Sequence, residues 1–119
     1  MKKCVLICDD DVDILEVCKF ILEKKNFQVK TCTSYDSVFS DMKEINPDII
    51  LMDLWMPGMG GEEATIKIKS NPDTKHIPVI LFSANNELEQ IANKVHANGF
   101  IRKPFELKEL QNILAEHCL

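Results

Sequence analysis

The sequence predicts an α/β fold in which one doubly wound, five-stranded parallel sheet carries helices on both faces. Short apolar runs alternate five times with segments of helical character, and the connections between them are short. Four of the five runs are followed by polar or charged residues that parallel strands would bring to one edge. This alternation is typical of βαβ units, whose strands are buried from both sides.

Five apolar runs are the expected strands. Residues 49–52 are apolar on both faces, which indicates a central strand, whereas the mixed composition of residues 28–32 makes that strand the weakest of the five. The expected strands are residues 3–8, 28–32, 49–52, 79–82 and 100–102.

Helical spacing and helix-ending residues mark five further segments. Ser34 is a plausible N-cap for the second helix, and Asn98-Gly99 is expected to stop the fourth. In the first helix, the i, i+3, i+4, i+7 pattern predicts a core-facing stripe of Ile14, Val17, Cys18 and Ile21. The expected helices are residues 12–25, 34–45, 62–70, 87–97 and 107–117.

Composition fits one water-soluble domain spanning residues 1–119. Hydrophobic residues make up 45% of the 119, and no window approaches the roughly 18 apolar residues of a membrane span. Three aspartates, at residues 9–11, interrupt the apolar N-terminal run, so we expect no signal peptide and a cytoplasmic location. The net charge of −5 argues against direct nucleic-acid binding. The five cysteines lack Cys-x-x-Cys spacing and are expected to be buried free thiols.

Polar side chains are predicted to gather where the strands end. Each has an ordinary explanation by itself, such as a turn, a helix cap or a solvated lysine. Their convergence on one edge of one sheet instead indicates a ligand site, because open α/β sheets bind ligands beyond the carboxyl ends of their strands. The residues are Asp9, Asp10 and Asp11, then Asp53, Ser83 and Lys103.

The grouped carboxylates favour a metal-assisted phosphoryl transfer. Asp9, Asp10 and Asp53 would repel one another without a cation, and Mg²⁺ accepts carboxylates together with phosphate oxygens. Asp53 is the best candidate nucleophile, since a carboxylate can form an aspartyl-phosphate. Lys103 would add positive charge, and the Ser83 hydroxyl could donate to a phosphoryl oxygen.

Four sequence runs resemble the receiver domains of two-component response regulators. They lie in the family's order and spacing and cover nearly the whole chain, at residues 5–11, 50–58, 79–84 and 100–105. The resemblance implies a flavodoxin-like sheet in the order 2-1-3-4-5. It also implies a signalling switch that takes a phosphoryl group onto Asp53 from a sensor histidine kinase or histidine phosphotransfer protein, and that catalyses its own phosphorylation and dephosphorylation. The downstream effector is not implied.

The same resemblance assigns roles to individual residues. Asp10, Asp53 and the backbone carbonyl of Trp55 would bind Mg²⁺, or Mn²⁺ as a substitute, with Asp9 acting largely through water. Lys103 and Ser83 would contact the phosphoryl group. The bond between Lys103 and Pro104 is expected to be cis.

Four positions concern the loops and the switch. Gly60 stands where the family often has Asp, which is expected to loosen its loop. Phe100 occupies the switch position, so switching would work through ring packing as Ser83 moves toward the phosphoryl group. Trp55 and Asn85 lie two residues past Asp53 and Ser83, at positions where the family varies its dephosphorylation rate. Trp55 could shield the phosphoryl group from water or be ordinary surface cover.

One residue of the first helix is a candidate contact for the phosphodonor. Leu15 lies about 100° from Ile14 on the helical wheel and is not needed by the predicted core stripe. It is therefore either a partly buried flank or a contact for a kinase or phosphotransfer helix.

Three alternatives share parts of this pattern. A haloacid-dehalogenase-like phosphatase would need an Asp where Trp55 stands. A flavodoxin-like flavin binder would need a Ser/Thr/Gly-rich loop where residues 9–11 are aspartates. A degenerate receiver used only for docking would not need the full set of polar residues described above.

Overall fold

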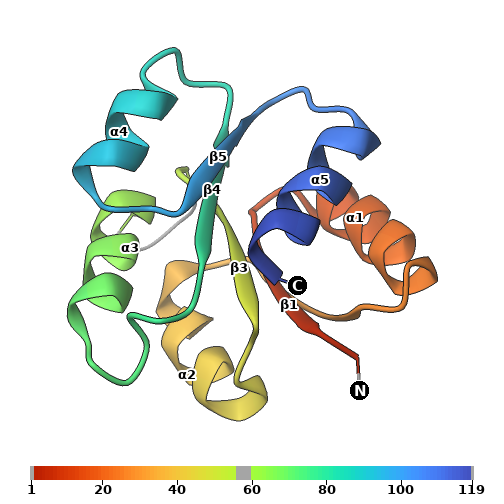
Figure 1. The fold of residues 1–119 in the computed structure, drawn as a ribbon, viewed down its shortest axis with the longest axis horizontal. Coiled ribbons are helices and arrows are strands. Elements are labelled where there is room, and N and C mark those ends of the chain that lie inside the picture. The colour runs from red at the N-terminus through yellow and green to blue at the C-terminus, as the bar shows by residue number, and fades with distance from the viewer. Residues whose placement is uncertain (1, 56–59, 119) are drawn as a thin grey trace.

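The computed structural model describes residues 2–55 and 60–118, and within them strands and helices alternate (Figure 1). The predicted succession of elements is confirmed. In chain order the elements are β1 (Cys4–Cys8), α1 (Val12–Lys24), β2 (Gln28–Cys32), α2 (Tyr35–Ile45), β3 (Ile49–Asp53), α3 (Gly61–Ser70), β4 (Val79–Ser83), α4 (Leu88–Lys94), β5 (Gly99–Arg102) and α5 (Leu107–Cys118).

All neighbouring strands pair in parallel, in the order β2-β1-β3-β4-β5. The expected topology is therefore confirmed, with β3 at the centre and the more polar β2 at an edge. An edge strand has one exposed flank, which explains why its sequence is mixed. Every residue of β3 is buried.

The sheet separates two hydrophobic layers. Figure 1 shows α1 and α5 covering one face, with α2, α3 and α4 covering the other. Alternate residues of β1 point into opposite layers. Leu6 and Cys8 pack with the α2–α4 layer, and Val5 and Ile7 pack with α1 and α5. This two-sided burial accounts for the uninterrupted apolar runs in the sequence.

The inward face of α1 differs from the predicted one. Leu15 is buried together with Cys18 and Leu22, whereas Val17 is 57% exposed. Both sets have helical spacing, so periodicity alone did not decide which was buried. Of the two alternatives for Leu15, contact with a phosphodonor is therefore excluded, because this side chain is buried in the core and not merely a partly buried flank.

The fourth helix is shorter than predicted. It ends at Lys94 rather than near residue 97, and His96 adopts a left-handed conformation with φ of 62°. The Ala97 N–H then donates to the Ala92 carbonyl at 2.9 Å, which closes the helix end in the manner of a Schellman motif. A histidine thus occupies the position that we assigned to Asn98-Gly99.

The remaining boundaries agree with the sequence to within one or two residues. Ser34 caps α2, with its side chain accepting from the Asp36 N–H. Cys4, Cys8, Cys18 and Cys32 are buried free thiols, as predicted, while the side chain of Cys118 lies outside the described residues. None of the helices in residues 2–55 and 60–118 is long and apolar enough to cross a membrane.

Candidate functional site

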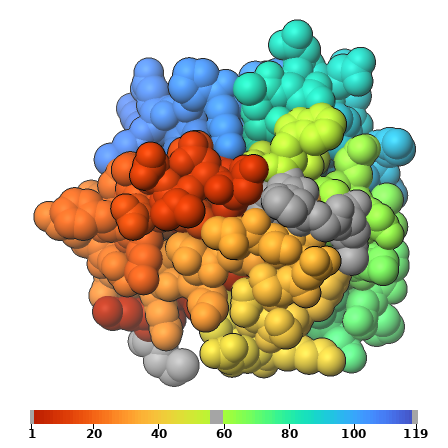
Figure 2. All heavy atoms as spheres, turned by 180° about the vertical axis from the view of Figure 1, so that it is seen from behind, coloured from red at the N-terminus to blue at the C-terminus, as the bar shows by residue number. Residues whose placement is uncertain are grey.

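The polar residues predicted at the strand ends lie at one edge of the sheet. Asp9 and Asp10 follow β1, Asp53 ends β3, Ser83 ends β4, and Lys103 follows β5. Their strands are parallel neighbours, so these ends meet. In Figure 2, which views the molecule from behind, the red-orange segment after β1 borders the blue segment around the start of α5.

Asp9 is fixed in place by neighbours on both of its carboxylate oxygens. Its side chain is fully buried, Oδ1 accepts from the Asp11 N–H at 2.9 Å, and Oδ2 accepts from Lys103 Nζ at 2.7 Å. Asp11 in turn caps α1, accepting from two backbone N–H groups of its first turn. The helix cap and the acidic site are therefore built by consecutive residues.

Lys103 links the acidic residues across the sheet. Its Nζ lies 3.6 Å from Asp53 Oδ2, in addition to its contact with Asp9, and 4.7 Å from the Phe82 ring centroid. The Lys103 N–H donates to the Ser83 carbonyl at 3.0 Å, which ties the start of the following loop to β4. The Lys103–Pro104 peptide is cis, as expected.

Asp53 is a buried carboxylate whose charge is poorly compensated. Burial raises its pKa to about 6, and the negative charge of Asp9 adds to the rise. Lys103 and the backbone N–H of Trp55 act in the opposite direction. Asp53 therefore takes up a proton more readily than an exposed aspartate does, and further positive charge entering the site would lower its pKa again.

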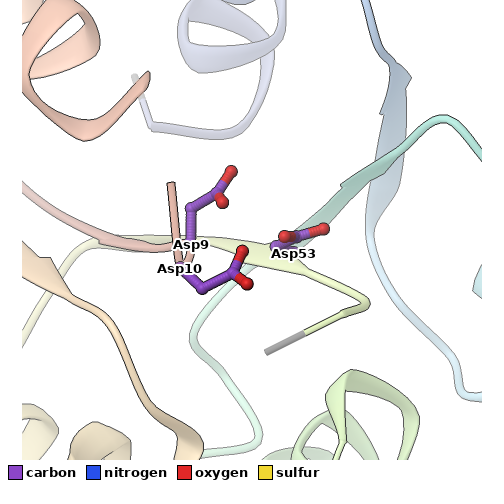
Figure 3. A group of neighbouring side chains, drawn as sticks. All are labelled: Asp9, Asp10 and Asp53. Atoms are coloured by element: carbon purple, nitrogen blue, oxygen red, sulfur yellow. The ribbon is translucent and has the colours of Figure 1, made fainter. Parts of the chain in front are cut away.

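Three carboxylates offer oxygen ligands to one cation. Figure 3 shows Asp9, Asp10 and Asp53 gathered at the ends of β1 and β3, and one oxygen from each lies within 4.8 Å of the others. Asp10 is exposed and the other two are buried, so a cation could approach from solvent on the side of Asp10. An all-oxygen donor set of like charges suits a hard divalent cation. The residues present therefore fit a metal site.

Ser83 is buried at the same edge and is engaged by the loop that follows it. Its Oγ accepts from the Asn85 N–H at 3.1 Å, and Asn85 Oδ1 accepts from the Glu87 N–H at 2.7 Å. Among the side-chain hydrogen bonds of residues 2–55 and 60–118, none joins Ser83 to Asp53. The structure brings Ser83 to the site without a direct bond to the candidate nucleophile.

Comparison with known proteins decides the family. The model of the response regulator receiver domain matches residues 5–115. The chain belongs to the response regulator receiver domain family. The phosphate regulon transcriptional regulatory protein PhoB of Escherichia coli is 34% identical over 112 residues, which are 92% of this chain and 49% of that protein. The heme response regulator HssR of Staphylococcus epidermidis is 36% identical over 107 residues, or 88% of this chain and 46% of that protein.

The receiver fold is also found among solved structures. The chemotaxis protein CheY4 of Vibrio cholerae superposes with a TM-score of 0.89 at 24% identity, covering 98% of this chain and 99% of the other. Receiver domains switch in a phosphorylation-dependent way within two-component systems and interact with histidine kinases. This receiver domain spans about half the length of the curated relatives that it matches. Family membership decides against the phosphatase and flavin-binding alternatives.

Two glycines shape the loop beside the receiver site. Gly60 has φ of 98°, a conformation that L-residues with a side chain rarely adopt, which gives a backbone reason for glycine there. Gly61 packs so closely that an added Cβ would lie 2.7 Å from the Asp53 carbonyl oxygen. The intervening part of this loop, residues 56–59, lies outside the described residues, and the expected loosening of the loop stays a prediction.

The Trp55 side chain is 69% exposed and lines a cavity of about 730 Å³ together with Asn85. Trp55 is therefore a surface residue close to Asp53 in the chain, and shielding of the phosphoryl group by its side chain stays a prediction.

Sequence reasoning missed Tyr35, which is fully buried and whose hydroxyl donates to the backbone carbonyl of Asp53. A single tyrosine at the start of a helix carries no motif that could have revealed this contact.

Proposed function

We propose that this receiver domain, taken as residues 1–119, accepts a phosphoryl group on Asp53. The observation that supports the proposal most strongly is the placement of Asp53. Its carboxylate lies at the end of the central strand, within 3.6 Å of the Lys103 ammonium group and beside the carboxylates of Asp9 and Asp10. A carboxylate with one adjacent cation and room for a metal has what phosphoryl transfer requires, namely positioning and charge stabilisation.

The cation that fits the site best is Mg²⁺, with Mn²⁺ as a substitute. Asp9, Asp10 and Asp53 would hold it, joined by the backbone carbonyl of Trp55, with Asp9 acting largely through water. When bound, Mg²⁺ would supply the positive charge that these buried carboxylates lack and that phosphoryl oxygens require. The raised pKa of Asp53 is in keeping with this deficit of positive charge.

Asp53, Lys103 and Ser83 have different roles in the proposed phosphoryl transfer. An oxygen of Asp53 attacks phosphorus, the bond between phosphorus and the donor imidazole nitrogen breaks, and that nitrogen leaves with the electron pair. Lys103 stabilises the charge on the phosphoryl oxygens, and Ser83 donates its hydroxyl hydrogen to one of them. The donor is a phosphohistidine of a sensor histidine kinase or of a histidine phosphotransfer protein.

A small-molecule phosphodonor tests the proposed reaction. Incubation with acetyl phosphate or carbamoyl phosphate and Mg²⁺ should add the mass of one phosphoryl group to the intact protein. The same incubation with EDTA should add none, and Asp53→Ala should remain unmodified with Mg²⁺. If Asp53→Ala were labelled as fully as the wild type, Asp53 would not be the acceptor.

We place the phosphodonor in a groove between α1 and α5. The groove has a volume of about 530 Å³ and opens beside the site, with Lys103 in its lining together with Ile14 and Val17 of α1 and Leu107 of α5. Its predominantly apolar lining suits the apolar face of a helix, and its continuity with Lys103 would bring a histidine on that helix toward Asp53.

Val17→Asp should therefore slow phosphotransfer from the partner by about tenfold or more, because it puts a charge on an apolar contact surface. Val17 is exposed, so the fold and labelling by acetyl phosphate should be unaffected. Ile66→Asp is the matched control, since Ile66 is an exposed apolar residue of α3 outside the groove. Equal slowing of transfer by both variants would argue against this docking site.

Phosphorylation is expected to change the packing of Phe100. The ring is partly buried against the α2–α4 layer and lies 6.0 Å from the Arg102 guanidinium carbon, while Arg102 Nη1 donates to the Asn85 carbonyl. Movement of Ser83 toward a phosphoryl group would open space that the ring can fill, a burial worth about 1–3 kcal/mol.

Side-chain NMR with and without beryllofluoride, which mimics the phosphoryl group, tests this switch. The rotamers of Ser83 and Phe100 should change together, and the surface formed by α4, β5 and α5 should shift. Unchanged rotamers at both residues would show that the signal leaves by another route. A downstream partner would read this surface in the cytoplasm, where we place the domain.

A further inference from the structure

Tyr35 joins the second helix to the backbone of the candidate nucleophile. It is the first residue of α2 and is fully buried in the hydrophobic layer on that side of the sheet. Its hydroxyl donates to the carbonyl oxygen of Asp53, across 18 residues of sequence. Burial, followed by the charge of Asp53, raises the pKa of Tyr35, so the hydroxyl keeps its proton and remains a donor.

The acceptor of this hydrogen bond is confined on its other side by α3. A Cβ at Gly61 would lie 2.7 Å from the Asp53 carbonyl oxygen, 2.8 Å from Leu54 Cα and 2.8 Å from the Tyr35 hydroxyl. The Gly61 N–H also donates to the Leu54 carbonyl, at 3.4 Å. The peptide group that joins Asp53 to Leu54 is therefore held between the first residues of α2 and α3.

The Asp53–Leu54 peptide group determines where the Asp53 carboxylate and the Trp55 backbone lie. Rotation about it would tilt the Asp53 side chain and would displace Trp55, whose N–H interacts with the Asp53 carboxylate and whose carbonyl is proposed to bind Mg²⁺. Without the Tyr35 hydroxyl, a buried carbonyl would lose a donor, and the peptide would be free to rotate toward another partner.

We propose that Tyr35 is a positioning residue, whose hydroxyl fixes the Asp53–Leu54 peptide so that the Asp53 carboxylate and the Trp55 carbonyl lie in place for Mg²⁺ and phosphoryl binding. The proposal rests on the proposed function of this site and adds a residue from α2 to it. Loss of a partner that orients a metal ligand typically weakens metal binding about 10- to 100-fold.

The test compares Tyr35→Phe with Thr65→Val. Thr65 is a matched control because it is also fully buried and its hydroxyl donates to a backbone carbonyl nearby, that of Gly61, at 2.7 Å. Each variant removes one buried hydroxyl with little change in shape. Urea unfolding reports the structural cost of each change, and Mg²⁺ titration, followed by the fluorescence of Trp55, the single tryptophan, reports the geometry of the site.

Both variants should lose stability, but only Tyr35→Phe should raise the Kd for Mg²⁺, by about tenfold. Its phosphorylation by acetyl phosphate at saturating Mg²⁺ should also be slower than that of Thr65→Val. An unchanged Kd in Tyr35→Phe, or an equal rise in both variants, would overturn the positioning role.

Two further measurements separate the role of Tyr35 from the proposed function and from a failure of Tyr35→Phe to fold. A wild type that binds Mg²⁺ but takes no phosphoryl group would contradict the proposed function, while the Kd ratio would still decide the role of Tyr35. If Tyr35→Phe does not fold, fluorotyrosine can replace the single tyrosine of the chain. Its ¹⁹F resonance should shift when Mg²⁺ is added, and no shift would overturn the proposal.

Discussion

Asp10→Asn should abolish the stabilisation of this receiver domain by Mg²⁺. In the wild type, a cation at one hundred times its Kd should raise the free energy of unfolding by about 2.7 kcal/mol, because it binds the native state preferentially. Asp10 is the exposed member of the carboxylate cluster and has no hydrogen-bond role in the fold among the described residues. Its loss as a ligand should therefore weaken Mg²⁺ binding by at least about 100-fold while the fold remains intact. Thermal unfolding with and without Mg²⁺ measures the effect.

Asp11→Asn is the control for Asp10→Asn. Asp11 carries the same charge one residue further along, but its side chain caps α1, a role that Asn fills equally well. This variant should keep the full Mg²⁺ shift. If Asp10→Asn also kept it, the cation would bind elsewhere.

Lys103→Met should have the largest effect on the metal-free protein. The substitution leaves Asp9 fully buried without its cation, and breaking a buried ion pair in this way costs about 3–5 kcal/mol. Mg²⁺ should recover part of the loss by supplying positive charge to the same carboxylates. Phosphorylation by acetyl phosphate should still fall by about 100-fold, the usual cost of losing a group that stabilises the transition state. Urea unfolding and intact mass follow the two effects.

Lys94→Met is the control for Lys103→Met, because it removes a lysine whose ion pair is exposed and not buried. Lys94 lies 3.7 Å from Glu62, with both side chains exposed, and exposed pairs contribute about 0–1 kcal/mol. Its replacement should change neither stability nor phosphorylation appreciably. Similar losses in Lys94→Met and Lys103→Met would contradict the account given for Lys103.

The site could be predicted from the sequence because its chemistry follows the strand ends. Asp9, Asp53 and Ser83 each close an apolar run, and parallel pairing necessarily brings such positions to one edge of the sheet. The strand order, in contrast, was inferred from the family resemblance, because alternation of strands and helices is compatible with more than one order. The candidate metal ligands and Lys103 could be named without information on side-chain packing.

The predictions that failed depend on tertiary packing. Two overlapping stripes on α1 have the same period, and only contact with the sheet decides that Leu15 is buried and Val17 exposed. The end of α4 depends on His96 accepting a left-handed backbone conformation that the sequence would assign to glycine. Tyr35 was missed because its hydroxyl donates to a backbone carbonyl, and every residue has a backbone carbonyl, so the partner's residue type gives no sign of the contact.

Chemical location of the phosphoryl group tests most sharply whether it resides on Asp53. Protein phosphorylated with acetyl phosphate and Mg²⁺ would be reduced with borohydride, which converts an acyl phosphate of aspartate to homoserine. Peptide mass spectrometry should then find homoserine at residue 53 and unmodified aspartate at residues 9 and 10. Homoserine at either of those aspartates, or a phosphoryl group that survives reduction as an ester, would contradict the account.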